Sequence, residues 1–529
     1  MSDERAASTT PAGTGQVLVE GWAEDVATLN PVLVQDTFSA LVSGLCFEGL
    51  LTSDGAGELL PALAESVPVV DGDGCTYRFT LRDGLRWSDG HPLTAADVVF
   101  TYGLMTDPAY EELGCPHRGE LTRHLAEVTA PDARTVVFRT RTEHAPFLVA
   151  HGQHGILPVH VLGDLDAGAL ASAEFNALPT VVNGVFTVAA RTPGEEIRFA
   201  RNPHYHRGPS RLDGFGYRIF PNGLAVAEAL RAGTVDVGLI DPSRLAELAE
   251  VAHLRTEIID LPTGNFYAYQ LDPDTPAGRI FADVRVRRAL LLGLDRETLV
   301  KEAYLGQASI ADSVVPPTSW AHDPQVAPTY PYDPQRAAAL LDEAGWRIGP
   351  DGVRERDGEP LRIEVVAGTN TKVWVDTAHA LADGWRRLGV DVELTLLDFA
   401  ELMGKVLQRR DFGVFMLAYT WGQEPDQSEL FSSAADLNCF GFAEAEVDSL
   451  LAAATATLDR AERVRLYHRY QALMAELVPA PMLFFLKGVY GIHRRVHGYR
   501  VATYNQFGAR PWMHEVTVDD HGHTIDQRQ

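Results

Sequence analysis

The chain has 529 residues, of which 46% are hydrophobic and 22% charged, as in an ordinary globular protein of three or four structural units. Asp and Glu number 72 against 45 Lys and Arg, so the formal net charge of −27 disfavours nucleic acid or a bare anionic membrane as the main partner. No apolar run approaches the roughly 20 residues of a membrane span. The 4 cysteines contain no CxxC pair, which excludes a zinc ribbon and a disulfide-dense scaffold.

Residues 1–15 are polar and rich in Ser, Thr, Gly and Ala. They contain no basic start followed by an apolar run, so we expect a flexible segment rather than a signal peptide. A short strand is expected over 16–19, followed by Trp22 and a turn at 29–31. Residues 36–51 carry apolar side chains at helical spacing.

The middle of the chain alternates strands with turns. Apolar and polar residues alternate over 75–81, which predicts a half-buried strand, and Thr94 with Asp97 has the pattern of a helix start. Another strand is expected over 135–140. The segments 186–191 and 197–201 flank a Thr-Pro-Gly turn and predict a hairpin.

The second half alternates strand and helix. Segments 361–366, 375–388 and 390–397 have the pattern of a strand–helix–strand unit, whose right-handed crossover gives parallel strands covered by a helix. The fold class is therefore α/β, in more than one lobe. The other elements expected are strands at 264–271 and 412–418 and helices at 284–292, 296–304, 334–344, 448–458 and 460–477.

No catalytic signature is present: there is no GxSxG, GxGxxG after a strand, P-loop or HExxH. His151 and His154 could share a helical face, and His204 and His206 one face of a strand, but a metal needs further converging ligands. We therefore predict no catalytic residue, metal or cofactor. The remaining closely spaced pair of histidines, at positions 521 and 523, lies near the end of the chain.

Aromatic residues gather at predicted strand ends and loops. In open α/β sheets ligands lie beyond the carboxyl ends of strands, and aromatic walls with a few polar groups form ligand pockets. The alternative for each residue is packing in a core. The residues concerned are Trp22, Trp87, Trp374, Tyr419, Trp421 and Trp512.

Several segments together resemble one protein family. The resemblance is to family 5 of the extracellular solute-binding proteins, the receptors of dipeptide, oligopeptide and nickel ABC importers, and it runs from about residue 16 to about residue 515 in the right order. The segments that carry it are LRDGLRWSDGHPLTAADVVFTY (81–102), VNGVFTVAARTPGEEIRFARNPHYHRG (182–208), FADVRVRRALLLGLDRETLVKEAYLGQA (281–308), YPYDPQRAAALLDEAGW (330–346), SELFSSAADLNCFGFAEAEVDSLL (428–451) and APMLFFLKGVYGIHRRVHGY (480–499).

The resemblance implies a periplasmic-binding-protein-like, two-lobed clamshell (type II, cluster C) with an extra α/β domain. Such a protein closes around its solute by hinge motion, without covalent chemistry, and delivers it to an ABC transporter permease. The resemblance also favours a monomer. The implied units are lobe I (16–48, 175–262 and 492–529), the additional domain (49–174) and lobe II (263–491).

The sequence departs from the family where the ligand is recognised. Peptide-binding relatives hold the peptide amine with an Asp at the place of Trp421, and a dipeptide-type Arg has no counterpart except Lys372. Arg118 and Arg123 lie in a loop that resembles the Arg-bearing loop of the nickel branch. A peptide, a nickel or other metal chelate, and another small polar solute therefore all remain open.

The candidate ligand-binding residues follow from the resemblance and from the aromatic pattern. They are Trp22, Asn265, Tyr267, Asn370, Lys372, Trp374, Tyr419, Trp421 and Glu424.

The resemblance implies an extracytoplasmic receptor. Residues 2–15 are typical of a tether behind a lipid-bearing cysteine, and a signal peptide would then be absent from this chain. If Met1 is the native start, the alternative is a cytoplasmic protein on the same fold, used as an enzyme or a ligand-sensing module of a specialised pathway. An enzyme would draw its acid–base groups from Glu424, Asp25, Lys372 and His154.

Overall fold

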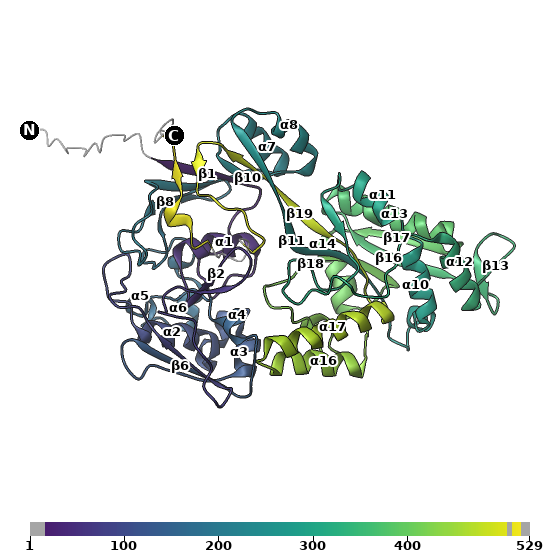
Figure 1. Cartoon of the computed structure of the whole chain (residues 1–529), viewed down its shortest axis with the longest axis horizontal. Coiled ribbons are helices and arrows are strands. Elements are labelled where there is room, and N and C mark those ends of the chain that lie inside the picture. Colours follow the sequence, from purple (N-terminus) through teal and green to yellow (C-terminus); the bar gives the residue numbers. More distant parts are fainter. Residues whose placement is uncertain (1–15, 505–509, 520–529) are drawn as a thin grey trace, which may run out of the picture.

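A mixed sheet of 11 strands runs through the computed structural model, which describes residues 16–504 and 510–519 (Figure 1). Along its main path the strand order is β17-β16-β18-β11-β19-β10-β1-β9-β8-β7, and β12 pairs with β19 off this path. With the unit boundaries expected from the sequence, one end of the sheet belongs to lobe I and the other to lobe II. No helix of the described residues is long and apolar enough to cross a membrane.

The lobe I end of the sheet is built around β1, which pairs in parallel with both β9 and β10. The predicted hairpin is confirmed, because β7 and β8 pair antiparallel across the turn. Helix α1 begins after Asp36, whose side chain accepts from the Ser39 N–H, and it ends at Cys46 because Phe47 is extended. The elements are β1 (Val17–Trp22), α1 (Thr37–Cys46), β7 (Phe186–Thr192), β8 (Glu196–Arg201), β9 (Gly214–Ile219), α7 (Gly223–Arg231), β10 (Val237–Leu239), η3 (Pro242–Arg244), α8 (Leu245–Ala249), β20 (Val496–His497), η6 (Met513–Glu515) and β21 (Thr517–Val518).

The lobe II end contains the predicted strand–helix–strand unit. Strands β16 and β17 pair in parallel over seven residue pairs, and α13 connects them, so the prediction is confirmed. Two buried apolar clusters on either side of these strands are formed by lobe II residues alone. The sheet elements here are β12 (Ala308–Ile310), β16 (Arg362–Gly368), α13 (Lys372–Arg387), β17 (Asp391–Leu397) and β18 (Val414–Thr420).

Helices cover both faces of the sheet in lobe II. They and the small remaining strands are α9 (Pro276–Phe281), α10 (Val284–Leu292), α11 (Arg296–Glu302), α12 (Pro334–Glu343), β13 (Arg347–Ile348), β14 (Arg354–Arg356), β15 (Glu359–Pro360), α14 (Phe399–Met403), the π-helical turn η4 (Gly404–Gln408), α15 (Ser428–Phe431), α16 (Ala445–Ala456) and α17 (Arg460–Leu477).

Two long antiparallel strands, β11 (Leu254–Tyr269) and β19 (Met482–His493), connect the lobes (Figure 1). Strand β19 reaches β10 in lobe I, whereas the second half of β11 pairs with β18 in lobe II. Their mutual register shifts between Asp260 and Gly264. Strand β11 starts earlier than the expected 264–271 because residues 254–260 also pair with β19.

The additional domain packs on lobe I and shares one continuous apolar cluster with it. Its main sheet has the order β4-β6-β5, which places the two predicted strands side by side. The capping box predicted at Thr94 and Asp97 opens α2. The elements are β2 (Leu51–Ser53), β3 (Leu59–Pro61), β4 (Thr76–Thr80), α2 (Ala95–Thr106), η1 (Pro108–Leu113), α3 (Arg118–His124), β5 (Leu125–Thr129), β6 (Thr135–Thr140), α4 (Phe147–His151), α5 (Val159–Leu162), α6 (Ala167–Ala171) and η2 (Glu174–Asn176).

Candidate ligand-binding site

A cavity of about 770 Å³ lies where lobe I, the additional domain and lobe II meet. This volume is within the range of about 300–1,000 Å³ that is usual for sites of small ligands. The start of α1 and the chain beyond it form one wall, α3 and α4 form a second, and residues 422–424 of lobe II close the third. The polar lining residues are Gln35, Asp36, Thr37, Ser43, Glu48, Thr52, His117, Glu120, Gln153, His154, Tyr205, Gln423, Glu424 and Arg510.

Two carboxylates belong to the wall from lobe I and the adjoining chain. Asp36 caps α1 and thus stands at the positive end of the helix dipole. Glu48 pairs with His206 at 2.6 Å and accepts from the Tyr205 hydroxyl. Burial opposes ionisation of Glu48, but these hydrogen bonds and the charge of His206 keep its pKa below the usual range, so Glu48 is ionised.

The wall of the additional domain is a cluster of imidazoles around one carboxylate. An oxygen of Glu120 lies 3.4 Å from His151 Nε2 and 3.8 Å from His144 Nε2, distances longer than those of ordinary hydrogen bonds. His151 Nδ1 contacts His154 Nε2 at 3.2 Å. Burial opposes ionisation of Glu120, but both neighbouring imidazoles hold its pKa well below the usual range.

The histidines that face the cavity are neutral. Burial first, and then the charges of nearby imidazoles, lower the pKa of His154 well below its ordinary value. The same two causes lower the pKa of His117. These two side chains therefore add hydrogen-bonding groups to the cavity but no positive charge near pH 7.

Gln423 of lobe II is hydrogen-bonded to two side chains of the additional domain. Its amide nitrogen donates to Ser53 Oγ at 2.7 Å, and its amide oxygen accepts from Gln153 Nε2 at 2.9 Å. The side chain is almost fully buried, as is Ser53. Direct hydrogen bonds of this kind stabilise the arrangement in which the lobes are together.

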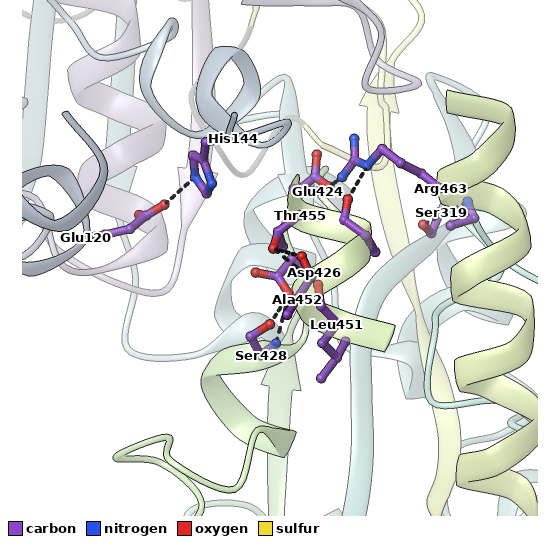
Figure 2. A network of polar contacts seen from close by, with 12 residues as sticks. Glu120, His144, Ser319, Glu424, Asp426, Ser428, Leu451, Ala452, Thr455 and Arg463 are labelled. Atoms are coloured by element: carbon purple, nitrogen blue, oxygen red, sulfur yellow. Dashed lines mark hydrogen bonds and ion pairs between the residues drawn. The ribbon is translucent and has the colours of Figure 1, made fainter. Parts of the chain in front are cut away.

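Further polar contacts join lobe II to the additional domain. The Ala145 N–H donates to the Thr455 carbonyl oxygen at 2.8 Å, and Arg460 pairs with Glu58 at 2.9 Å. Figure 2 shows His144 and Glu120 across from the carboxylate of Asp426. Burial raises the pKa of Asp426, which is held by hydrogen bonds from Ser428.

Of the predicted ligand residues, Glu424 is the one that lines this cavity. Its carboxylate forms an ion pair with Arg463 (Figure 2). Tyr419 and Trp421 lie together, with ring centroids 4.3 Å apart, and both pack in or against an apolar cluster of lobe II. Tyr419 is the penultimate residue of β18, which ends at Thr420 rather than at 418 as expected, because residues 419 and 420 continue the pairing with β11.

The other predicted residues lie apart from the cavity wall. Trp22 stacks on Phe38 with centroids 5.0 Å apart. Asn265 donates to the Tyr304 hydroxyl at 2.8 Å, and Tyr267 is fully buried in the core of lobe II.

Three predicted residues stand around the N-terminus of α13. Asn370 is exposed, and Trp374 is half-buried in the first turn of the helix. Lys372 is largely exposed and pairs with Asp376 on the same helix. As a set, the predicted residues are therefore not brought together by the structure, and their contact with a ligand stays a prediction.

The remaining candidates also have structural partners. Asp25 contacts Arg191 and accepts from the Gly194 N–H. Arg118 donates to backbone carbonyl oxygens around Asp107. Over residues 16–504 and 510–519, no group of three or more His, Cys, Asp or Glu side chains is arranged to hold a metal. The four cysteines, all in the described part, are free, whereas positions 521 and 523 lie outside the described residues.

The sequence interpretation missed most of the cavity. Asp36, Glu120, Gln153 and Gln423 come from segments far apart in the chain, so no local pattern unites them. Asp36 is the first residue of the segment 36–51 predicted as helical, and Glu120 lies inside the segment HRGELTRH, of which the arginines resemble the nickel branch. His154 was noted as half of a pair, and the structure joins that pair by a direct contact.

Comparison with known proteins identifies relatives over nearly the whole chain. The family model for the bacterial extracellular solute-binding proteins, family 5, matches residues 58–438. The oligopeptide-binding protein AppA of Bacillus subtilis is 26% identical over 92% of this chain and 89% of its own. The probable deoxycholate-binding periplasmic protein YgiS of Escherichia coli is 28% identical over 90% of this chain and 89% of its own.

Solved structures agree with the fold. The structure of AppA from Bacillus subtilis in complex with a nonapeptide superposes with a TM-score of 0.79 at 24% identity, covering 96% of this chain and 99% of that one. NikZ from Campylobacter jejuni in complex with Ni(L-His) also has a TM-score of 0.79, at 23% identity, and covers 95% and 99%. At these identities the structures establish the fold, which is the predicted periplasmic-binding-protein-like α/β fold.

Proposed function

The chain belongs to the bacterial extracellular solute-binding proteins of family 5, and we propose that it is the receptor of an ABC importer that encloses a short peptide or another small polar solute in the cavity between its lobes. Membership of this family makes it a solute-binding receptor and supports a location outside the cytoplasm. That role needs no covalent chemistry. Delivery to a transporter permease is supported by relatives named as peptide-binding proteins of ABC transporters.

The observation that carries the proposal is the cavity itself. Its walls come from all three units, so a molecule bound there contacts both lobes at once. A ligand that touches both lobes binds the closed arrangement more tightly than the open one, and its differential affinity draws the equilibrium toward closure. This is how a receptor of this fold turns binding into a shape that a permease can distinguish.

The ligand class is proposed from the size and lining of the cavity. Relatives are named for ligands as different as oligopeptides and deoxycholate, so their names do not settle the solute of this chain. A volume of about 770 Å³ suits a small molecule or a short peptide. The neutral imidazoles of His117 and His154 and the amide of Gln153 offer hydrogen bonds from one wall.

Binding and closure can be measured together. We expect isothermal titration with the correct solute to give one site per chain, and small-angle X-ray scattering to show a smaller radius of gyration at saturation. The trial solutes are di-, tri- and tetrapeptides, nickel–histidine complexes and deoxycholate. A solute that binds with one-to-one stoichiometry but leaves the scattering curve unchanged, also in the Gln423→Ala variant, would contradict closure around the ligand.

Lipid anchoring also remains a proposal. Residues 1–15 lie outside the described residues, and only their polar composition, which suits a tether, supports it. Mass spectrometry of the N-terminal peptide of the protein isolated from its native membranes tests this directly. A diacylated cysteine ahead of this sequence is expected, and a free, unmodified Met1 would contradict it.

A further inference from the structure

The cavity between the lobes has more negative than positive charge on its walls. Among the described lining residues, Arg510 is the one Arg or Lys. Four carboxylates line the same space, and they come from lobe I, the additional domain and lobe II: Asp36, Glu48, Glu120 and Glu424.

The positive charge of Arg510 is already compensated by the carboxylate of Glu20. Its guanidinium donates to both carboxylate oxygens of Glu20, at 2.9 and 3.2 Å, and both side chains are buried. Tyr499 donates to the same carboxylate at 2.6 Å. Removing this arginine from its buried partner to bind a ligand anion would leave Glu20 as an uncompensated buried charge, which is strongly unfavourable.

Two of the four carboxylates, Glu48 and Glu424, are compensated by basic side chains behind the wall, His206 and Arg463. The other two, Asp36 and Glu120, keep their charge available to the cavity. Asp36 is bound by the backbone N–H of Ser39 and by no described Lys, Arg or His. Its neighbour Glu24 responds to this charge, because burial and the negative charge of Asp36 raise the pKa of Glu24.

Glu120 is the second carboxylate with charge available to the cavity, because its distances to imidazoles are longer than the 2.6 Å between Glu48 and His206. Its contacts are with the imidazoles of His144 and His151, at 3.8 and 3.4 Å, and its side chain is 42% exposed. The remaining imidazoles at the wall, His117 and His154, are neutral near pH 7 and do not offset the negative charge. Asp36 and Glu120 thus face the cavity from two different walls.

We infer that the solute of this receptor carries a positive charge, as an amine, guanidinium or quaternary ammonium group received by Asp36 and Glu120, and brings no carboxylate into the cavity. The inference rests on the proposed function, since it concerns the ligand of that same cavity. A buried cation is compensated here by two carboxylates, whereas a buried ligand carboxylate would meet like charges without a free cation. Among the solutes proposed above, a free dipeptide, which has a carboxylate next to its amine, is therefore disfavoured against a cation that has no carboxylate.

A cysteine reporter tests the charge of the cavity without knowledge of the ligand. Ala40 lies one helical turn after Asp36, and Ala150 lies in α4 beside His151; both line the cavity. In a Cys75→Ser background, Ala40→Cys and Ala150→Cys are each treated with the trimethylammonium-ethyl and the sulfonato-ethyl methanethiosulfonates. Rates are normalised to those of free mercaptoethanol.

We expect the cationic reagent to react at least about fivefold faster than the anionic one at both positions. Asp36→Asn with Glu120→Gln, which keeps a helix cap at 36, should bring the ratio close to 1, whereas Glu302→Gln on the exposed face of α11 should leave it unchanged. Equal rates, or faster reaction of the anionic reagent, would overturn the inference.

Titration with trialanine in four end-group forms tests the ligand class itself. The forms are the cationic amide, the acetylated amide, the free zwitterion and the acetylated acid. The cationic amide should bind at least about tenfold tighter than either form with a carboxylate. Equal or tighter binding of those two forms would overturn the inference. If no form binds, the ratio of the two reagent rates decides whether the inference holds. If that ratio is at least about fivefold as expected but none of the trial solutes binds either, the result counts against the proposed function and not against the charge of the cavity.

Discussion

Gln423 combines two roles that are usually separate, because it lines the cavity and also fastens one lobe to the rest of the molecule. Its two hydrogen bonds, to Ser53 and from Gln153, are buried. At about 1 kcal/mol for each bond, Gln423→Ala should shift the equilibrium toward the open form by about 2 kcal/mol.

The affinity of Gln423→Ala should therefore fall by about tenfold or more, and by a similar factor for two unlike ligands, because both bind the same less populated form. Isothermal titration measures the two factors. Gln325→Ala, at an exposed position, is the matched control. A loss confined to one ligand would show that Gln423 acts as a ligand contact and not as a fastening.

The imidazole of His154 should make the free energy of unfolding depend on pH. Its pKa in the folded chain is well below the ordinary 6.5, mainly because of burial, so the unfolded chain takes up this proton first as the pH falls. The free energy of unfolding should therefore be at its plateau above about pH 6.5 and decrease below it.

Denaturant titrations between pH 7.5 and 4.5 measure this slope. His154→Asn removes one of the groups responsible and should give a flatter profile than the wild type. His379→Asn, on the exposed side of α13, should keep the wild-type slope. Identical slopes in all three proteins would contradict the assignment.

At the scale of elements, the turn between β2 and β3 depends on glycine. Gly57 has a φ of +92°, and a Cβ there would lie 3.1 Å from the ring of Tyr504 and 3.5 Å from Gln423. Gly57→Ala combines a left-handed backbone with a close contact, so it should lower the free energy of unfolding by about 1–2 kcal/mol or more. Gly72→Ala, where no heavy atom lies within 4 Å of the added Cβ, is the control. Equal stability of the two variants in chemical denaturation would refute this account.

Elements with a local signal were predicted well. The strand–helix–strand unit around α13 and the helices α10 and α17 follow from local sequence patterns, and the structure confirms them. The ends of β11 and β18 were misplaced because long-range pairing, with β19 and with β11, decides where those strands begin and end.

The cavity could not be predicted from the sequence, for a related reason. Asp36, Glu120 and Gln423 have no fixed spacing, and they meet only because the lobes and the additional domain pack together. Asn265 and Tyr267, which were candidate ligand residues in the strand expected over 264–271, lie buried in lobe II. The resemblance to a family predicted the fold, but it did not predict which side chains line this cavity.

For the whole molecule, the free energy of closure depends on the contacts that form only when the units come together. Strands β11 and β19 connect the two lobes covalently (Figure 1). The contacts of Gln423, Ala145 and Arg460 between lobe II and the additional domain exist only when these two units are together. A ligand adds its own contacts to this set. The free energy of closing is thus shared between protein and ligand, so that weakening either part should weaken binding.

Native mass spectrometry of the wild type and of Ala150→Trp, which places an indole in the cavity from α4, tests the central claim most directly. We expect the wild type to carry one small solute per chain that is lost on denaturation, and the variant to be folded and to carry none. A variant that retains the same solute at the same occupancy would place the binding site elsewhere and contradict this account.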